Sequence, residues 1–373
     1  LAIDGFGLGF EAVTSFLKGS CVSVGKAYVK VLQAQLGVGN TTVDLTEMLL
    51  TGKGIDEVEI EAYRTGAKGT LELVDAYKLG TTFVSDVETV GSSDSTGLDL
   101  TLVFDKIGHT VPVYDRATGK MVGTPVKTGF DIQGNKYDGG LAPDDTGDAA
   151  QALKSGTLAT GMPSGVALDY YVKFDGAAGW LALDTFQMGF EAATTFGVDG
   201  LSLGKPVPDT VMLGLGLSAP VAGLLKNIVQ GTNLPSIEIE AYAQGIKGPT
   251  LVDEYKFTDA FITQLDSANT SSNDVGFVFK SFTHGHIDID AGGKALPFNG
   301  VGMDFSTLKT VPAPTPSDSY VQTALLPAVP QGADLQYFIK FKDGTFKDSE
   351  KWLQIDGFGL GFERLVQFCT GMQ

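Results

Sequence analysis

The sequence is poor in cysteine and in basic residues. Its two cysteines, Cys21 and Cys369, are too few for a disulfide framework or a cysteine-based zinc site. Lysine and arginine together number 26 against 44 aspartate and glutamate residues, so the formal net charge is −18. A field of this sign repels nucleic acid and anionic lipid headgroups. We therefore expect no nucleic-acid partner.

Long apolar runs are also absent. The longest uncharged apolar stretch, residues 210–225, is interrupted by glycine, serine and proline, and it is shorter than the roughly 18 residues that a membrane span needs. We therefore expect no membrane insertion. Lysine is scarce beside many threonine, serine, glycine and aspartate residues, a composition that favours an extracellular protein.

Motifs for catalysis are missing as well. The sequence contains no HExxH, GxSxG or Walker-type loop, and it has three histidines, His109, His284 and His286. His284 and His286 would share one face of a strand, as metal ligands can, but no third ligand is evident and we interpret them as an exposed strand end. We predict no enzyme, no cofactor, no metal site and no small-molecule substrate.

What the sequence does contain is an internal repeat. The segment LAIDGFGLGFE at residues 1–11 returns as LALDTFQMGFE at 181–191 and as LQIDGFGLGFE at 353–363, at spacings of 180 and 172 residues. The glycines of the first copy resemble a nucleotide-binding loop, but the second copy lacks two of them, which favours a strand. The first two copies also share EIEAYRTGAKG at 59–69 and EIEAYAQGIKG at 238–248. The chain is therefore a tandem duplication followed by the beginning of a third copy.

Within each copy the pattern predicts mostly strands. YYVKF at 170–174, an Asp-Gly turn and the segment 180–183 predict a hairpin, because Asp-Gly supplies the positive φ that tight turns require. One helix is expected in each copy, over 41–50 ending at Gly52, and from an N-cap at Ser218 to Gly231. Many short strands with one helix indicate an all-β barrel or sandwich.

The order of these segments resembles Hcp, the tube protein of type VI secretion, which is related in fold to phage tail-tube proteins. The resemblance rests on YYVKFDG and YFIKFKDG, on WLALDTFQMGFE, SLGK and IEIEAY, and on the late strand LVDEYKFTDAFITQLD. It implies small β-barrels with one helix that assemble side by side into hexameric rings and stack into tubes, and it implies no catalytic residues. The tandem arrangement departs from the usual single-domain protein.

The resemblance divides the chain into five parts. We expect two tandem Hcp-like β-barrels plus a C-terminal partial repeat, joined by two linkers of at most 27 residues. The predicted parts are a first barrel lacking its first strand at 1–140, a linker at 141–167, a complete second barrel at 168–310, a proline-rich linker at 311–334, and a partial third repeat at 335–373.

The strand that the first barrel lacks has a surplus copy near the end of the sequence. YFIKF at 337–341 repeats YYVKF, and a barrel missing a strand exposes unpaired backbone groups that can accept one. We expect a subunit interface between this C-terminal segment and the start of the first barrel. Its predicted residues are Tyr337, Phe338, Ile339, Lys340, Phe341, Trp352, Leu353, Ile355 and Phe358 on one side and Leu1, Ile3 and Phe6 on the other.

Three arrangements remain open. The C-terminal segment of one subunit can enter the next and form a head-to-tail fibre, or the native polypeptide can be a longer tandem array, or the chain can close into a ring or complete itself. The near-identity of 1–11 and 353–363, with ten of eleven residues the same, favours the array.

Acidic residues carry two further hypotheses. Loops with several aspartates could hold calcium through carboxylate oxygens, but the spacing fits no EF-hand and we favour solvated turns. The loops are at Asp144, Asp145 and Asp148, and at Asp288 and Asp290. Paired glutamates share a strand face where like charges repel, so we expect a solvent-facing or lumen-facing wall or partners with nearby lysines. These are Glu59, Glu61, Glu238 and Glu240, with Lys68 and Lys247.

The sequence thus predicts a secreted structural protein, a homo-polymer that self-assembles as a fibre or tube. One alternative is a secretion-type or phage-type tube in which three chains form a pseudo-hexameric ring. Another is a calcium-binding or carbohydrate-binding adhesive module. Cys21 and Cys369 could crosslink neighbouring subunits, but they do not align in the repeat and we interpret them as unrelated thiols.

Overall fold

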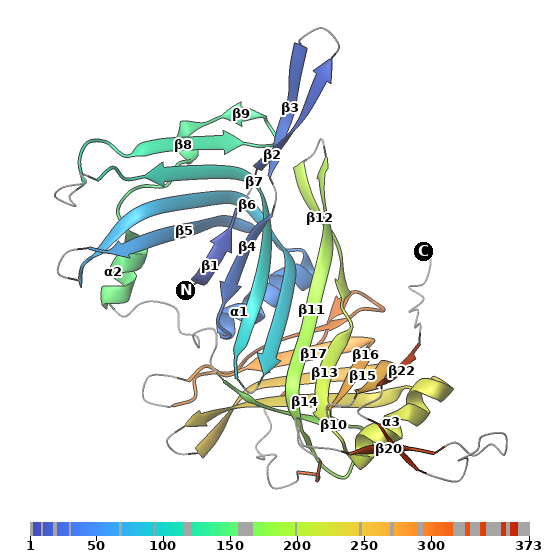
Figure 1. Cartoon of the computed structure of the whole chain (residues 1–373). Coiled ribbons are helices and arrows are strands. Elements are labelled where there is room, and N and C mark those ends of the chain that lie inside the picture. Colours follow the sequence, from blue (N-terminus) through green and yellow to red (C-terminus); the bar gives the residue numbers. More distant parts are fainter. Residues whose placement is uncertain are drawn as a thin grey trace.

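The chain folds mainly into antiparallel strands, as Figure 1 shows for the computed structural model. The structure describes residues 3–8, 10–17, 21–29, 31–66, 69–92, 94–114, 121–155, 167–197, 200–245, 248–268, 272–289, 294–315, 325–328, 336–340, 352–355 and 359–364. Three α-helices occur in these residues, one main helix in each of the first two repeats and one short additional helix. The all-β class is therefore confirmed.

Six strands close the barrel of the second repeat. They are β10 (Asp169–Phe174), β11 (Leu181–Gly197), β13 (Val211–Gly216), β14 (Leu234–Gly245), β15 (Gly248–Ala268) and β16 (Ser272–Val278). Their pairing runs β10–β11–β13–β16–β15–β14 and returns from β14 to β10. The predicted hairpin is confirmed, with Tyr170 opposite Leu183 and Gly176 at a φ of 77° in its turn.

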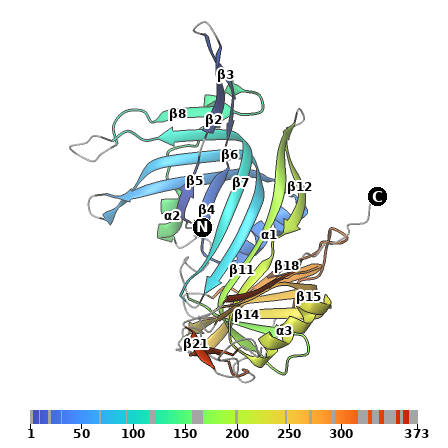
Figure 2. The same cartoon turned by 45° about the vertical axis from the view of Figure 1, so that its right-hand side comes forward.

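The first repeat has the same sequence of strands without a counterpart of β10. Its strands are β1 (Ile3–Gly7), β4 (Leu32–Leu36), β5 (Ile55–Thr65), β6 (Leu71–Ser92) and β7 (Thr96–Val111). They pair in the order β1–β4–β7–β6–β5. The strands β2 (Phe10–Leu17) and β3 (Cys21–Val29) form a separate hairpin, which Figures 1 and 2 both show projecting from the barrel.

Further strands extend both sheets. In the first repeat these are β8 (Val126–Asp131) and β9 (Lys136–Tyr137), and in the second they are β12 (Gly200–Pro208), β17 (Ser281–His286), β18 (Asn299–Asp304) and β19 (Lys309–Thr310). The C-terminal part contributes β20 (Tyr337–Ile339), β21 (Leu353–Ile355) and β22 (Gly359–Glu363).

Both repeats place one helix at the same point. α1 (Asn40–Thr51) ends at Gly52, whose φ of 68° is the left-handed conformation that glycine adopts readily, and α3 (Ala219–Gln230) ends in the same way at Gly231. Ser218 precedes α3 as predicted, but its hydroxyl makes no capping hydrogen bond. None of the described helices is long and apolar enough to cross a membrane. The short helix α2 (Asp148–Ser155) lies in the predicted linker.

The two repeats also share their irregularities. Thr81 in β6 and Asp259 in β15, which are equivalent positions, both have a φ of 49°. The ladder of β6 shifts register between Val84 and Asp86, and that of β15 shifts between Ile262 and Gln264 at the matching point. Bulges bend a strand and increase its twist, so both repeats turn the long strand out of the barrel at the same place.

The described core of the second repeat is rich in aromatic residues. Its buried aromatic residues pack with ring centroids between 4.9 and 6.4 Å apart and include Phe257, Phe277, Phe279 and Phe282. In the first repeat the buried core is mostly aliphatic around Phe104. Each buried apolar side chain of this size contributes roughly 1.5–3 kcal/mol, so these aromatic residues contribute strongly to the stability of the second barrel.

Candidate assembly site

The first barrel is open between β1 and β5. In the part of the chain that the structure describes, β1 pairs with β4 alone and β5 pairs with β6 alone. Their counterparts β11 and β14 are both bridged by β10. By the repeat, a strand equivalent to β10 would lie between Ile3 and Ala62, as Tyr170 lies between Leu183 and Ala241. The repeat therefore assigns one strand to the open side.

The side chains of β1 show the effect of this opening. Phe186 is fully buried against Tyr170 and Tyr255, with centroids 5.7 and 5.1 Å away. Its counterpart Phe6 keeps the equivalent contact, to Tyr77 at 5.5 Å, but is only half-buried. One wall of the apolar pocket around Phe6 is thus absent, which forfeits part of the burial that stabilises β11.

The C-terminal hairpin has the geometry of the strand that is missing. In β20 and β21, Tyr337 lies opposite Ile355, and Ile339 lies opposite Leu353. The hairpin of the complete barrel pairs Tyr170 with Leu183 and Val172 with Leu181, which is the same register. The hairpin therefore has the register that the complete barrel uses.

Apolar side chains of this hairpin are exposed, although their counterparts in the second barrel are buried. Phe338, Ile339 and Trp352 are 51%, 37% and 66% exposed. The equivalent residues Tyr171, Val172 and Trp180 are 5%, 0% and 9% exposed. Phe338 and Ile339 follow each other in β20, so both faces of this strand expose apolar side chains whose counterparts are buried in the second barrel.

The other predicted interface residues are placed as follows. Ile3 and Phe6 lie in β1, Tyr337 in β20, Lys340 directly after it, and Leu353 and Ile355 in β21. Leu1, Phe341 and Phe358 lie outside the described residues. No partner chain is described, so the subunit interface stays a prediction.

A continuous sheet joins the two barrels. The far end of β6 pairs with β11 over seven positions, from Asp86 opposite Glu191 to Ser92 opposite Thr185. Tyr170 lies within hydrogen-bond distance of Thr96 across this junction, with the two hydroxyl oxygens 3.2 Å apart. Its ring leaves no space for a side chain at Gly91, where a Cβ would lie 2.5 Å from it. The junction is therefore closely packed.

The same junction is repeated at the second barrel. The far end of β15 pairs with β22 over five positions, from Gln264 opposite Glu363 to Ala268 opposite Gly359. Gln264 is the counterpart of Asp86, and Glu363 that of Glu191, so the two junctions have the same register. The C-terminal segment therefore sits on the second barrel as the second barrel sits on the first.

One residue of the C-terminal segment differs in chemistry from the residue at the same position of the other copies. Arg364 stands where the second copy has Ala192, and its Nη1 donates to the carbonyl oxygens of Ile228 and Val229 at 2.9 and 3.2 Å. These carbonyls end α3, where the helix dipole favours a cation. A Cβ at Gly231 would lie 2.4 Å from the guanidinium, so glycine allows this approach. Arg364 fastens β22 to the second barrel.

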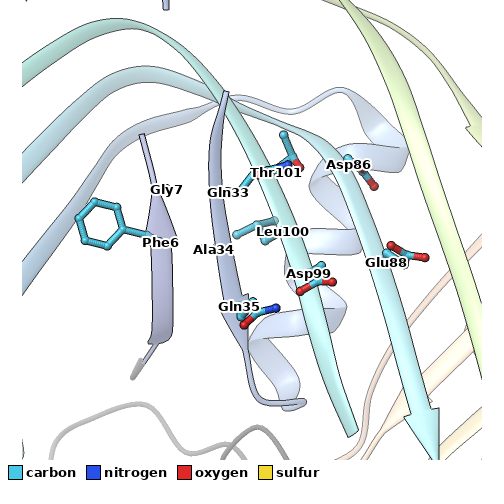
Figure 3. A pocket seen from close by; sticks show the side chains of 10 residues that line it. All are labelled: Phe6, Gly7, Gln33, Ala34, Gln35, Asp86, Glu88, Asp99, Leu100 and Thr101. Atoms are coloured by element: carbon cyan, nitrogen blue, oxygen red, sulfur yellow. The ribbon is translucent and has the colours of Figure 1, made fainter. Parts of the chain in front are cut away.

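Carboxylates collect beside the first junction. An open pocket of about 430 Å³ lies at the junction end of the first barrel. Figure 3 labels the residues that line it, which are Phe6, Gly7, Gln33, Ala34, Gln35, Asp86, Glu88, Asp99, Leu100 and Thr101. Burial and the nearby carboxylates of Asp209 and Glu88 raise the pKa of Asp86 to about 6. Glu88 also faces Asp99 across the strands. The pocket is therefore acidic and repels anions.

The histidine prediction is wrong for His284 and His286. His286 is fully buried and His284 is 5% exposed, because both side chains turn into the barrel and share the Oδ1 atom of Asp253, at 2.7 and 2.9 Å. His286 also bonds Asp288, with Nε2 and Oδ1 3.0 Å apart. Burial alone lowers the pKa of His286, but Asp253 and Asp288 outweigh it and raise the pKa to about 9.

This buried cluster reaches the first repeat. The backbone N–H of Asn40, at the start of α1, donates to Oδ2 of Asp288 at 3.4 Å. Asn299 donates from its side chain to Asp44 at 2.9 Å. Among the described residues of the first repeat, one contact of this kind occurs, between Nε2 of His109 and Oδ1 of Asp75, 2.5 Å apart. The additional histidine of the second repeat therefore helps to hold α1 against the second barrel.

The described aspartates of the two loops form hydrogen bonds or ion pairs with neighbouring residues. Asp144 accepts hydrogen bonds from Thr146, and Asp145 pairs with Lys127, as in solvated turns. The prediction of a solvated turn is wrong for Asp288, which is buried and bonded to His286, and Asp290 lies outside the described residues. No cluster suited to a metal ion occurs among the described residues.

The paired glutamates depart in part from the expected wall. Glu59 lies 3.6 Å from Lys78, and Glu238 pairs with Lys256 at 2.9 Å. Glu240 is buried, and the hydroxyl of Tyr242 donates to it at 2.5 Å. Lys68 and Lys247, and the side chains of Cys21 and Cys369, lie outside what the structure describes.

The comparisons with known proteins found matches among solved structures. No protein-family model and no curated protein match the chain. Among solved structures, a type six secretion system protein is 24% identical, with a TM-score of 0.37, and the match covers 39% of this chain and 100% of that one. Hcp1 from Salmonella typhimurium is 17% identical, with a TM-score of 0.31 and coverages of 39% and 100%. Hcp3 from Pseudomonas aeruginosa is 16% identical, with a TM-score of 0.24 and coverages of 37% and 98%.

Each of these three matches spans nearly the whole of the solved chain but less than half of this one.

Proposed function

We propose that the protein is a structural subunit of an extracellular fibre or tube, and that it polymerises head to tail. In this assembly the C-terminal hairpin of one chain completes the first barrel of the next. The observation that carries the proposal is the exposure of Phe338, Ile339 and Trp352 in a hairpin whose counterpart is buried.

The open barrel supplies a fitting acceptor. With the register of β10, Tyr337 would lie opposite Ala62, and Ile339 would lie opposite Ile60 of β5. β5 would then gain the backbone partners that β14 has in the complete barrel. Strand addition of this kind combines main-chain hydrogen bonds with pockets for alternate side chains.

Apolar burial supplies part of the stabilisation of this contact. Burying an apolar side chain of this size contributes roughly 1.5–3 kcal/mol, so three half-exposed side chains together contribute about 2–5 kcal/mol. The ladder with β5 adds to this, while ordering the joined segments opposes it. Because the contact is heterologous, it continues from chain to chain unless the rotation closes a ring.

Negative-stain electron microscopy of the full chain tests this proposal. Fibres or tubes are expected, and monodisperse monomers would contradict it. Deleting residues 335–373 should abolish assembly, as should Ile339→Asp, because a carboxylate would be buried without a partner. Val126→Asp, a matched change at a 61% exposed position of β8, should leave assembly intact. Assembly that persists without residues 335–373 would reject the donor role.

A ring-based tube is the second candidate. Its support is the equal register of the β6·β11 and β15·β22 junctions, which relates successive repeats by one operation. Three chains would supply six barrels if that rotation closes. Class averages with a closed ring would favour this form, whereas continuous fibres would favour the open one. The intact mass of the denatured native protein separates a 39.2 kDa subunit from a longer tandem array.

A further inference from the structure

We propose that the C-terminal segment replaces β1 in the first barrel of the next chain, rather than inserting beside it. This inference rests on the proposed function and specifies how the C-terminal segment of one chain binds the first barrel of the next. In the exchanged barrel, β20 lies beside β5, and β21 takes the place of β1 beside β4. The partner is a second copy of this chain.

The edges of β20 exclude simple insertion while its hairpin persists. A strand has two hydrogen-bonding edges, and one edge of β20 is already paired with β21. Insertion between β5 and β1 would use both edges, so the β20·β21 hairpin would have to break. Replacement keeps the hairpin, because β21 then lies between β20 and β4. This is the place that β11 has between β10 and β13 in the second barrel.

The sequence makes replacement nearly neutral for β4. Residues 353–363 and 1–11 differ only at Gln354, which stands where the first copy has Ala2. β1 pairs with β4 from Ile3 opposite Leu36 to Gly7 opposite Gln33. The incoming segment offers the same residues at each of these positions, so β4 loses no apolar partner when the strands exchange. The gain is the ladder between β20 and β5.

β1 is also the weakly held member of the pair. Ile3 and Phe6 are half-buried, whereas the equivalent Leu183 and Phe186 are buried. The C-terminal segment has an anchor that β1 lacks, because Arg364 binds the end of α3 and its backbone N–H donates to Thr263 at 2.8 Å. A donor anchored on its own second barrel is held at the junction before the next chain arrives.

The junction geometry agrees with this mode. β22 already pairs with β15 in the register that β11 uses with β6. A barrel completed on β21 and β22 would therefore stand relative to the second barrel as the second barrel stands relative to the first. β22 and the start of the next chain are two copies of the same segment, and both could pair with the same edge of β15. With replacement, β22 keeps this edge.

A reversible lock on β1 tests the inference. Gly7 and Gln33 lie opposite each other, Gln33 is exposed, and a Cβ at Gly7 meets no atom within 4 Å. Gly7→Cys with Gln33→Cys, in a background carrying Cys21→Ser and Cys369→Ser, should form an intrachain disulfide. We expect the oxidised chain to assemble at least tenfold less than the reduced chain, and dithiothreitol to restore assembly.

Normal assembly of the oxidised chain would overturn replacement and leave the proposed function standing. Absence of assembly in the unlocked full chain, or assembly that survives deletion of 335–373, would instead refute the proposed function. A matched pair of variants gives a second measurement. Ile355→Asp should abolish assembly, while the equivalent Ile3→Asp should preserve it, because β1 leaves the barrel; loss of assembly with Ile3→Asp alone would contradict replacement.

Discussion

Removing the buried imidazole of His286 is expected to destabilise the second barrel in a pH-dependent way. His286→Val introduces the residue that the first repeat has at this point, Val111. The change leaves Asp288 without its histidine partner and removes one of the two histidines that bond Asp253. Breaking a buried pair on one side typically costs about 3–5 kcal/mol.

The pH dependence follows from the raised pKa of His286. A pKa raised from 6.5 to about 9 corresponds to about 3 kcal/mol of stabilisation. Because the folded state holds the proton more tightly than the unfolded state, this stabilisation is complete below pH 6.5 and is lost as the pH rises through 9. The groups facing the ring are Asp253 and Asp288, and His284 lies on the same carboxylate.

Urea unfolding followed by tryptophan fluorescence, with Trp180 in the second barrel as the reporter, measures this effect. The difference in unfolding free energy between wild type and His286→Val should be about 3 kcal/mol at pH 6 and should shrink toward pH 9.5. Subtracting the unfolding free energy of the variant from that of the wild type cancels the contribution of groups that titrate equally in both proteins. A difference that stays constant or grows between pH 6.5 and 9.5 would refute the reasoning.

Three further predictions concern the junctions between repeats. Arg364→Ala should free β22 and increase the hydrogen exchange of residues 359–363, with Arg364→Lys partly restoring protection; unchanged exchange would count against the anchor. Asp86→Asn should stabilise the protein by about 1 kcal/mol above pH 6, after allowance for solvent screening, and by nothing below pH 4, because the raised pKa destabilises the folded state only where the carboxylate is charged. Gly91→Ala should cost about 1–3 kcal/mol by forcing the ring of Tyr170 aside, as measured by thermal unfolding, whereas Gly223→Ala in α3, where a Cβ meets no atom within 4 Å, should cost nothing.

Much of the fold could be predicted from the sequence, because its signals are local. The Asp-Gly turn at 175–176 and the glycines that end α1 and α3 act within a few residues, and the structure places each of them as predicted. Because the two copies repeat the same pattern, a signal found in one copy also predicts the structure of the other. The hydroxyl of Ser218 was the exception, since its capping role depends on orientation and not on position.

The candidate site could be predicted only in part. The surplus strand at 337–341 was visible in the sequence as a copy of 170–174, but its register with β21 was not. The burial of His284 and His286 was missed because their partner Asp253 lies more than 30 residues away, on a neighbouring strand. Arg364 was missed because no motif relates it to the end of α3.

The sequence by itself determined the two repeats, the partial third copy and the strand and helix types within them, since residue periodicity and turn chemistry act over short distances. Only the tertiary structure decided which strands meet. A period of two assigns a residue to a face but names no neighbouring strand, so the closed second barrel, the open edges of β1 and β5, and the equal β6·β11 and β15·β22 junctions depend on pairings between distant segments.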